Sequence, residues 1–80
     1  MVEATARVAA VIDARGLACP LPLVKLRQAL MVVEPGARVC LLATDPATPA
    51  DVQAFCESAA HELVDQDITP SLITLVVQKA

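Results

Sequence analysis

The sequence has few aromatic residues, glycines and basic residues, and each shortage excludes a class of structure or function. Among its 80 residues Phe55 is the only Phe, Tyr or Trp, so a core must be built from Val, Leu, Ile and Ala, which suits a sheet packed against helices. Only two glycines occur, which leaves no glycine-rich loop for phosphate binding. Six Lys and Arg against nine Asp and Glu give a net charge of -3. This balance argues against a dedicated nucleic-acid-binding protein, because phosphate contacts need clustered basic side chains.

Long apolar runs are also absent, although the mean hydropathy is +0.61. The longest stretch without a charged residue spans residues 68–78 and is interrupted by Thr, Pro and Ser. It falls short of the ~18 apolar residues that cross a bilayer. The first residues, in which Glu3 and Arg7 flank short aliphatic pieces, do not resemble a signal peptide. We therefore expect a soluble cytoplasmic protein of one domain, residues 1–80, without a membrane partner.

The three cysteines, Cys19, Cys40 and Cys56, form neither a Cys-x-x-Cys pair nor a zinc-binding spacing. We expect no metal and no cofactor, and an odd cysteine count without a secretory signal suggests a reducing compartment. Cys40 lies in an aliphatic run and Cys56 on an apolar helical stripe, so both are predicted to be buried packing residues. The sole histidine, His61, is expected to cap a helix end or lie on the surface rather than act as a base. A self-contained enzyme with a substrate pocket is therefore not expected.

Hydrophobic periodicity predicts the element order βαβαββ. The predicted elements are strand 7–12, helix 20–33, strand 39–43, a helix from 49 to 60 or 61, strand 62–67 and strand 72–78. Two right-handed βαβ crossovers would place both helices on one face of a mixed four-stranded sheet. The predicted fold class is therefore α/β, a two-layer sandwich.

Each predicted helix carries an apolar stripe that should pack on the sheet. The stripe residues are Leu23, Leu26, Ala29, Leu30 and Val33 in the first helix, and Val52, Phe55, Cys56 and Ala59 in the second. Thr48 has the residue type of an N-cap for the second helix, and Pro49 suits its first position. The negative charge of Asp51 would then interact favourably with the positive end of the helix dipole.

The chain is organised around residues 13–22, Asp-Ala-Arg-Gly-Leu-Ala-Cys-Pro-Leu-Pro, which join the first strand to the first helix. Gly16 permits a sharp reversal and Pro20 suits the first helical position, so Cys19 is expected at or beside the helix N-cap. There the helix dipole and the free N–H groups of the first turn would stabilise an anion and lower the thiol pKa. Ser, Thr, Asp or Asn would cap better, so stability alone explains Cys19 poorly. The alternative is a small buried apolar residue that precedes a helix.

Half of the six basic residues, Arg15, Lys25 and Arg27, fall around the Cys19 turn. They could favour the thiolate and steer an acidic partner surface toward the cysteine. The alternative is that they only solvate a helix face.

The loops after the first two strands, residues 16–19 and 44–48, should meet at the carboxyl edge of the sheet, where ligand sites of α/β proteins gather. Asp45 and Thr48 are therefore possible neighbours of Cys19. The alternative is that they serve only as turn and helix-cap residues.

The Cys-Pro-Leu-Pro motif at residues 19–22, preceded by Asp-x-x-Gly-Leu at residues 13–17, resembles the Cys-Pro-x-Pro signature of the TusA/SirA-like sulfur-carrier family. A second stretch, residues 45–64, is similar to the corresponding segment of that family. The resemblance implies a persulfide on Cys19 and a supporting turn made of Gly16, Pro20, Leu21 and Pro22. Leu21 stands where the family motif carries Glu, a change that leaves the carrier chemistry intact and bears on the choice of partner.

The resemblance further implies a sulfur carrier, or sulfurtransferase, that relays sulfane sulfur between proteins. Its expected partners are a persulfide donor of the cysteine desulfurase or rhodanese type and an acceptor protein of a sulfur relay. Transfer to tRNA thiolation, to molybdenum-cofactor synthesis or to sulfur oxidation would each need the same Cys19. We expect a monomer that does not bind nucleic acid directly. Two alternatives stay open: a regulatory docking module that uses residues 19–22 without chemistry, and a nucleic-acid-binding domain, which the acidic charge disfavours.

Overall fold

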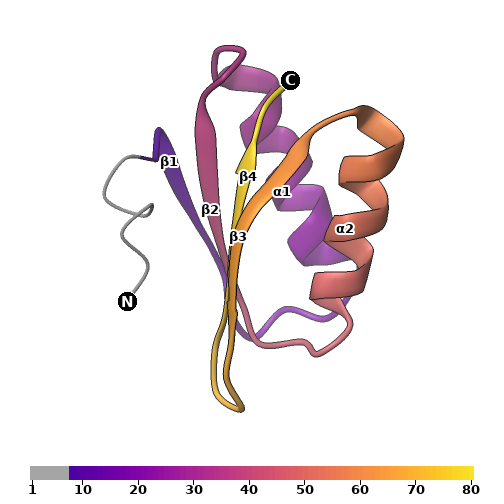
Figure 1. The fold of residues 1–80 in the computed structure, drawn as a ribbon. Helices are drawn as coiled ribbons and strands as arrows, with labels where there is room; N and C mark the ends of the chain where they lie inside the picture. The colour runs from indigo at the N-terminus through magenta and orange to yellow at the C-terminus, as the bar shows by residue number, and fades with distance from the viewer. Residues whose placement is uncertain (1–7) are drawn as a thin grey trace.

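The strands and helices follow the predicted order, βαβαββ (Figure 1). The computed structural model describes residues 8–80. Its elements are β1 (Ala10–Ala14), α1 (Leu21–Val32), β2 (Arg38–Ala43), α2 (Thr48–Ala59), β3 (Glu62–Ile68) and β4 (Ile73–Gln78). The first strand was expected to begin at Arg7, which lies outside the described residues. β1 runs beyond its predicted end because Asp13 and Ala14 still pair with residues of β2.

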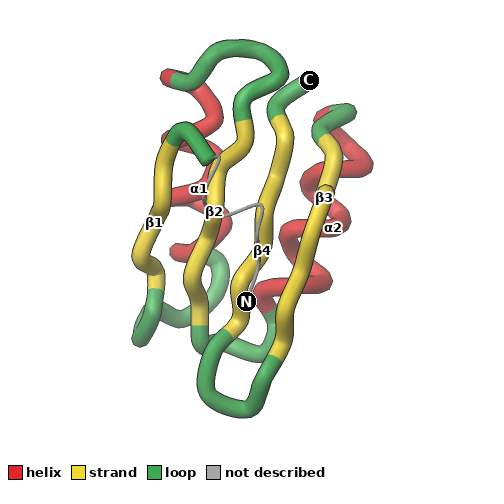
Figure 2. The backbone as a smooth tube through the Cα atoms, turned by 60° about the vertical axis from the view of Figure 1, so that its left-hand side comes forward, coloured by secondary structure: helices red, strands yellow, loops and turns green. Residues whose placement is uncertain are grey.

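The four strands form one sheet in the order β1-β2-β4-β3. β1 is parallel to β2, and β4 is antiparallel to both of its neighbours. β4 takes a central position because all its residues except Gln78 are buried, whereas the more polar β3 forms an edge. Both helices cover the same face of the sheet (Figures 1 and 2), which confirms the predicted two-layer sandwich.

The core lies between the sheet and the two helices. Its fully buried side chains include Leu26, Val39, Leu41, Val52, Leu75 and Val77. Cys40 and Cys56 are buried, as predicted. Ala59, predicted on the core stripe of α2, is exposed instead. The helix ends at this residue, and Ala60, with a φ of 64°, turns the chain back toward β3, so the buried stripe stops at Cys56.

Both helices begin one residue away from their predicted starts. Pro20 is the N-cap of α1 rather than its first residue. Thr48 was predicted as the N-cap of α2 and is instead its first helical residue, after Ala47. The reason is a turn made by Asp45, whose main-chain carbonyl accepts the N–H of Thr48 at 3.0 Å and so draws this residue into the helix. The Thr48 hydroxyl is buried and has no hydrogen-bond partner among the described residues.

Each helix is 12 residues long, and none in residues 8–80 has the length and apolar character to cross a bilayer.

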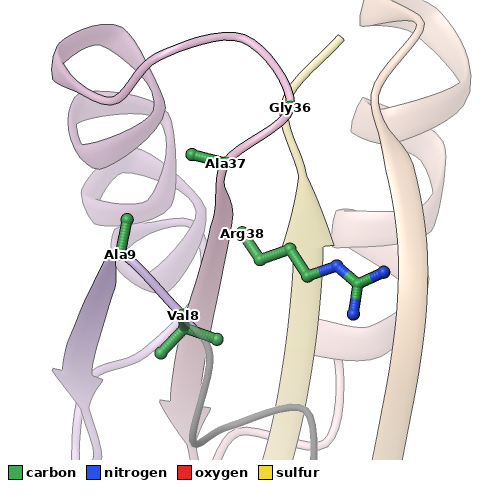
Figure 3. A pocket seen from close by; sticks show the side chains of 5 residues that line it. All are labelled: Val8, Ala9, Gly36, Ala37 and Arg38. Carbon is green, nitrogen blue, oxygen red and sulfur yellow. The ribbon is translucent and has the colours of Figure 1, made fainter.

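The two edges of the sheet differ in what they offer to a partner. At the edge where β1 and β2 begin lies a hollow of about 330 Å³. Figure 3 shows the residues that line it, which are Val8, Ala9, Gly36, Ala37 and Arg38. Arg38, its only titratable residue, donates from Nε to Oε1 of Gln78 on β4 at 3.0 Å. This hollow contains no nucleophile. The opposite edge, where both strands end, carries the cysteine turn.

Candidate functional site

Cys19 lies in the turn between β1 and α1, and its side chain is exposed. The chain leaves β1 at Ala14, reverses at Gly16 with a φ of 80°, and reaches α1 through a cis peptide bond between Cys19 and Pro20. Gly16 donates its N–H to Oγ1 of Thr44 at 2.9 Å, which ties this turn to the loop after β2. The predicted meeting of the two loops at one sheet edge is therefore confirmed.

Asp45 holds Cys19 in place from the neighbouring loop. Its Oδ2 atom accepts the N–H of Cys19 at 2.8 Å, and its Oδ1 atom accepts the N–H of Ala47 at 2.9 Å. These two backbone hydrogen bonds lower the pKa of the Asp45 carboxyl, so it stays ionised near neutral pH. One carboxylate thus bridges the loop before α1 and the loop before α2.

Asp51, in the first turn of α2, contacts the thiol itself. The Sγ atom of Cys19 donates a hydrogen bond to Oδ2 of Asp51, although 32 residues separate the two in the chain. The N–H of Leu21, one of the first-turn N–H groups that were expected to stabilise an anion at Cys19, instead donates to the carbonyl of Ala18 at 2.9 Å. The partner of the sulfur is therefore a carboxylate rather than this amide of the helix N-terminus.

The predicted lowering of the Cys19 pKa is wrong. The hydrogen bond to Asp51 raises the pKa of this thiol from 9.0 to about 11, with smaller contributions from desolvation and from the negative charges of Asp51 and Asp45. A carboxylate that accepts the thiol proton favours the neutral thiol, and nearby negative charge disfavours the thiolate. At pH 7 a pKa of about 11 leaves roughly one thiol in ten thousand ionised.

The three basic residues predicted around the turn lie beside groups other than the Cys19 thiol. Arg15 donates from Nε and Nη2 to the two carboxyl oxygens of Asp13, each at 2.9 Å, and this pairing lowers the pKa of Asp13 to about 2. The Arg27 guanidinium lies 5.9 Å from the centroid of the Phe55 ring. Lys25 is exposed beside β1. None of the three is among the groups that shift the Cys19 pKa, and their role in steering a partner stays a prediction.

Comparison with known proteins shows to which family this chain belongs. A family model described as sulfurtransferase TusA matches residues 10–79. The chain belongs to this family. The TusA sulfur carrier protein of Pseudomonas fluorescens is 46% identical over 55 residues, 69% of this chain and 66% of that protein. TusA of Pseudomonas aeruginosa is 42% identical over 62 residues, 78% of each chain.

A solved structure shares the TusA-family fold. The crystal structure of a SirA-like protein from Desulfitobacterium hafniense matches with a TM-score of 0.75, covering 86% of this chain and 95% of that one. The two sequences are 22% identical. Two helices on one face of a four-stranded mixed sheet are therefore common to both proteins.

The Cys-Pro-x-Pro turn of this TusA-family protein places its residues in different surroundings. Pro22 is buried under the turn, whereas Pro20 and Leu21 lie on the surface beside Cys19. Leu21 is 50% exposed, so the turn presents an apolar side chain to solvent two residues after Cys19. Thr48 is buried, and its hydroxyl hydrogen-bonds to none of the described residues. Of the two predicted neighbours, Asp45 is joined to Cys19 by a hydrogen bond, whereas the role of Thr48 at the site stays a prediction.

Sequence reasoning missed Asp51 as a member of the site. Its position at the start of α2 was explained by the helix dipole alone. One signal could have pointed to it: α2 starts directly after the loop that meets the Cys19 turn, so its first turn lies at the same sheet edge.

Proposed function

We propose that this protein is a sulfur carrier that holds a persulfide on Cys19 and relays sulfane sulfur from a donor protein to an acceptor protein. The observation that carries the proposal is an exposed thiol fixed by two loops at one edge of the sheet. Membership of the TusA family supports it. The names of the Pseudomonas relatives, sulfur carrier proteins, point the same way.

The relay requires little more than an accessible sulfur on a rigid turn. In loading, Cys19 Sγ attacks the outer sulfur of the donor's persulfide, and the donor leaves as a thiol. In unloading, a thiol of the acceptor attacks the outer sulfur on Cys19. A second thiol within reach would attack the loaded persulfide, form a disulfide and release sulfide. Cys40 and Cys56 are both buried, which protects the cargo from this reaction.

The donor is proposed to be a cysteine desulfurase or a rhodanese, and the acceptor a protein of a sulfur relay. The relay would serve tRNA thiolation, molybdenum-cofactor synthesis or sulfur oxidation. Partner choice is expected to depend on exposed side chains around the thiol, among them Leu21, Arg15 and Lys25. An exposed leucine in place of an acidic residue favours a partner whose contact surface is apolar at this point.

Intact-protein mass spectrometry tests the proposal. The protein is incubated with a cysteine desulfurase and cysteine, or with a rhodanese and thiosulfate, then alkylated and mapped by peptide. We expect the mass of one or more sulfur atoms on the peptide that contains Cys19, and no gain in Cys19→Ser. Sulfur that stays bound in this variant, or the absence of any gain with both donors in the unchanged protein, would contradict a carrier role for Cys19.

One observation favours a second candidate, a regulatory docking module that uses residues 19–22 without chemistry. The raised pKa makes Cys19 a weak nucleophile in the isolated protein. A docking module predicts that Cys19→Ala keeps partner binding and cellular function, whereas a carrier predicts that this variant binds its donor and loses function.

A further inference from the structure

Before sulfur can be transferred to Cys19, its thiol has to lose the proton that it donates to a hydrogen bond. The Cys19 thiol donates to Oδ2 of Asp51, and the side chain is exposed, so a donor can reach the sulfur while this hydrogen bond is in place. A thiol attacks a persulfide effectively only as it loses its proton. The group that already accepts the hydrogen bond is the group placed to take the proton.

We propose that Asp51 is a catalytic residue, which accepts the Cys19 proton as the thiol attacks the donor persulfide and returns it to the departing donor sulfur. This inference rests on the proposed sulfur-carrier function. It concerns how the thiol is made reactive, which the identity of the cysteine alone does not explain.

The step balances without an added oxidant or reductant. A bond forms between Cys19 Sγ and the outer sulfur of the donor persulfide, and the bond between the two donor sulfurs breaks. The proton moves from Sγ to Oδ2 of Asp51 and then to the donor sulfur, which leaves as a neutral thiol. The Cys19 sulfur is formally oxidised by one unit and the inner donor sulfur is reduced by one unit. Unloading runs through the same proton positions in reverse.

Other described groups are less suited to this role. The two oxygens of the Asp45 carboxylate accept the main-chain N–H groups of Cys19 and Ala47 rather than the thiol. His61, the sole histidine, accepts the N–H of Ala80 at 3.0 Å and has its ring 5.5 Å from that of Phe55, beyond the far end of α2. Within residues 8–80, Asp51 is the residue that accepts a hydrogen bond from the sulfur.

A carboxylate is a weak base for a thiol at equilibrium, and its contribution comes in the transition state. As the new sulfur–sulfur bond forms, Sγ becomes much more acidic, and a base already in contact takes the proton without a preceding ionisation step. General-base assistance of this kind contributes typically ~100-fold or more to a rate. It also lets the unloaded carrier stay protonated and unreactive between encounters.

Two rates measured on Asp51→Asn separate this role from a simple charge effect. The first is alkylation of Cys19 by iodoacetamide at pH 7, which follows the thiolate population. The second is sulfur loading from cysteine persulfide, a small donor chosen so that protein docking does not enter. Removing the carboxylate raises the thiolate population, so alkylation should accelerate, whereas loss of the base should slow loading by ~10-fold or more.

Two further variants complete the test. Asp51→Glu restores a carboxylate and should recover most of the loading rate. Glu57→Gln removes one negative charge from the exposed second half of α2 and should leave both rates unchanged. Alkylation and loading that change in the same direction in Asp51→Asn, or loading that does not change, would overturn the inference. If the unchanged protein gains no sulfur from any donor, the proposed function itself fails, a result distinct from a loaded protein that is indifferent to Asp51.

Discussion

Cys19 differs from Cys40 and Cys56 less in the direction of its pKa than in the cause. All three thiols have raised pKa values, but burial raises those of Cys40 and Cys56, whereas the contact with Asp51 is the main cause at exposed Cys19. Burial in a core can be reversed only by opening the fold. A hydrogen bond at the surface can be reversed by a partner or by movement of one proton. A raised pKa therefore accompanies an inert thiol in the core, and at the surface a thiol that can become reactive again.

Serine substitutions should separate the two regions most strongly. Cys40→Ser and Cys56→Ser each bury a hydroxyl among apolar side chains and should lower the free energy of unfolding by ~1–3 kcal/mol. Cys19→Ser places its hydroxyl at the surface and should leave stability nearly unchanged. Urea denaturation followed by circular dichroism measures all three. Equal destabilisation at all three positions would contradict the contrast between core and surface cysteines.

Labelling with iodoacetamide in native buffer gives a smaller difference. We expect Cys19 to react ~10-fold faster than either buried cysteine, because the buried thiols become accessible only when the structure opens. The margin is reduced by the high pKa of Cys19, since an opened Cys40 or Cys56 ionises near 9.0. Peptide mapping at several reaction times gives the labelling rates. In denaturant the difference between the rate at Cys19 and the rates at Cys40 and Cys56 should disappear. Native labelling of Cys56 as fast as Cys19 would contradict the expected difference.

Alkaline pH should produce the smallest effect. In the unfolded chain the thiols ionise near 9.0, whereas the pKa of folded Cys19 is about 11. Between these values the unfolded state binds fewer protons, so the free energy of unfolding falls as pH rises through this window and is unaffected below it. Thermal denaturation at a series of pH values measures the decline. Cys19→Ser should make it shallower, and an identical decline in this variant would show that Cys19 contributes none of it.

The fold could be predicted largely from the sequence because the apolar periodicity of each segment agrees with its role in the sheet or in a helix. The stripe around Leu26 and the apolar run at residues 39–43 are examples, and most of their residues are buried as expected. The first residues of the helices were harder to predict, since the turn made by Asp45 moves the start of α2 by one residue. Such a shift depends on hydrogen bonds that no periodicity records.

The chemistry of the site was harder to predict than its place. Cys19 could be located on its turn from Gly16 and the prolines alone. The direction of its pKa shift could not be predicted in this way. The basic residues near Cys19 in sequence do not shift its pKa, and the acid that contacts it, Asp51, comes from another element. Asp51 reaches the thiol only through the way α2 packs beside α1, a property of the whole fold.

The carboxylate of Asp45, which accepts N–H groups from both loops, has a consequence for any attempt to reproduce this chemistry in a smaller molecule. A synthetic peptide of residues 13–32 would contain the whole Cys-Pro-Leu-Pro motif and its helix. It would lack Asp45 and Asp51. Its cysteine would therefore behave as an ordinary thiol, with neither a fixed backbone nor a proton acceptor. The smallest unit that can be transplanted is therefore a pair of neighbouring βα turns, and engineering that alters one of them has to treat the other as part of the same device.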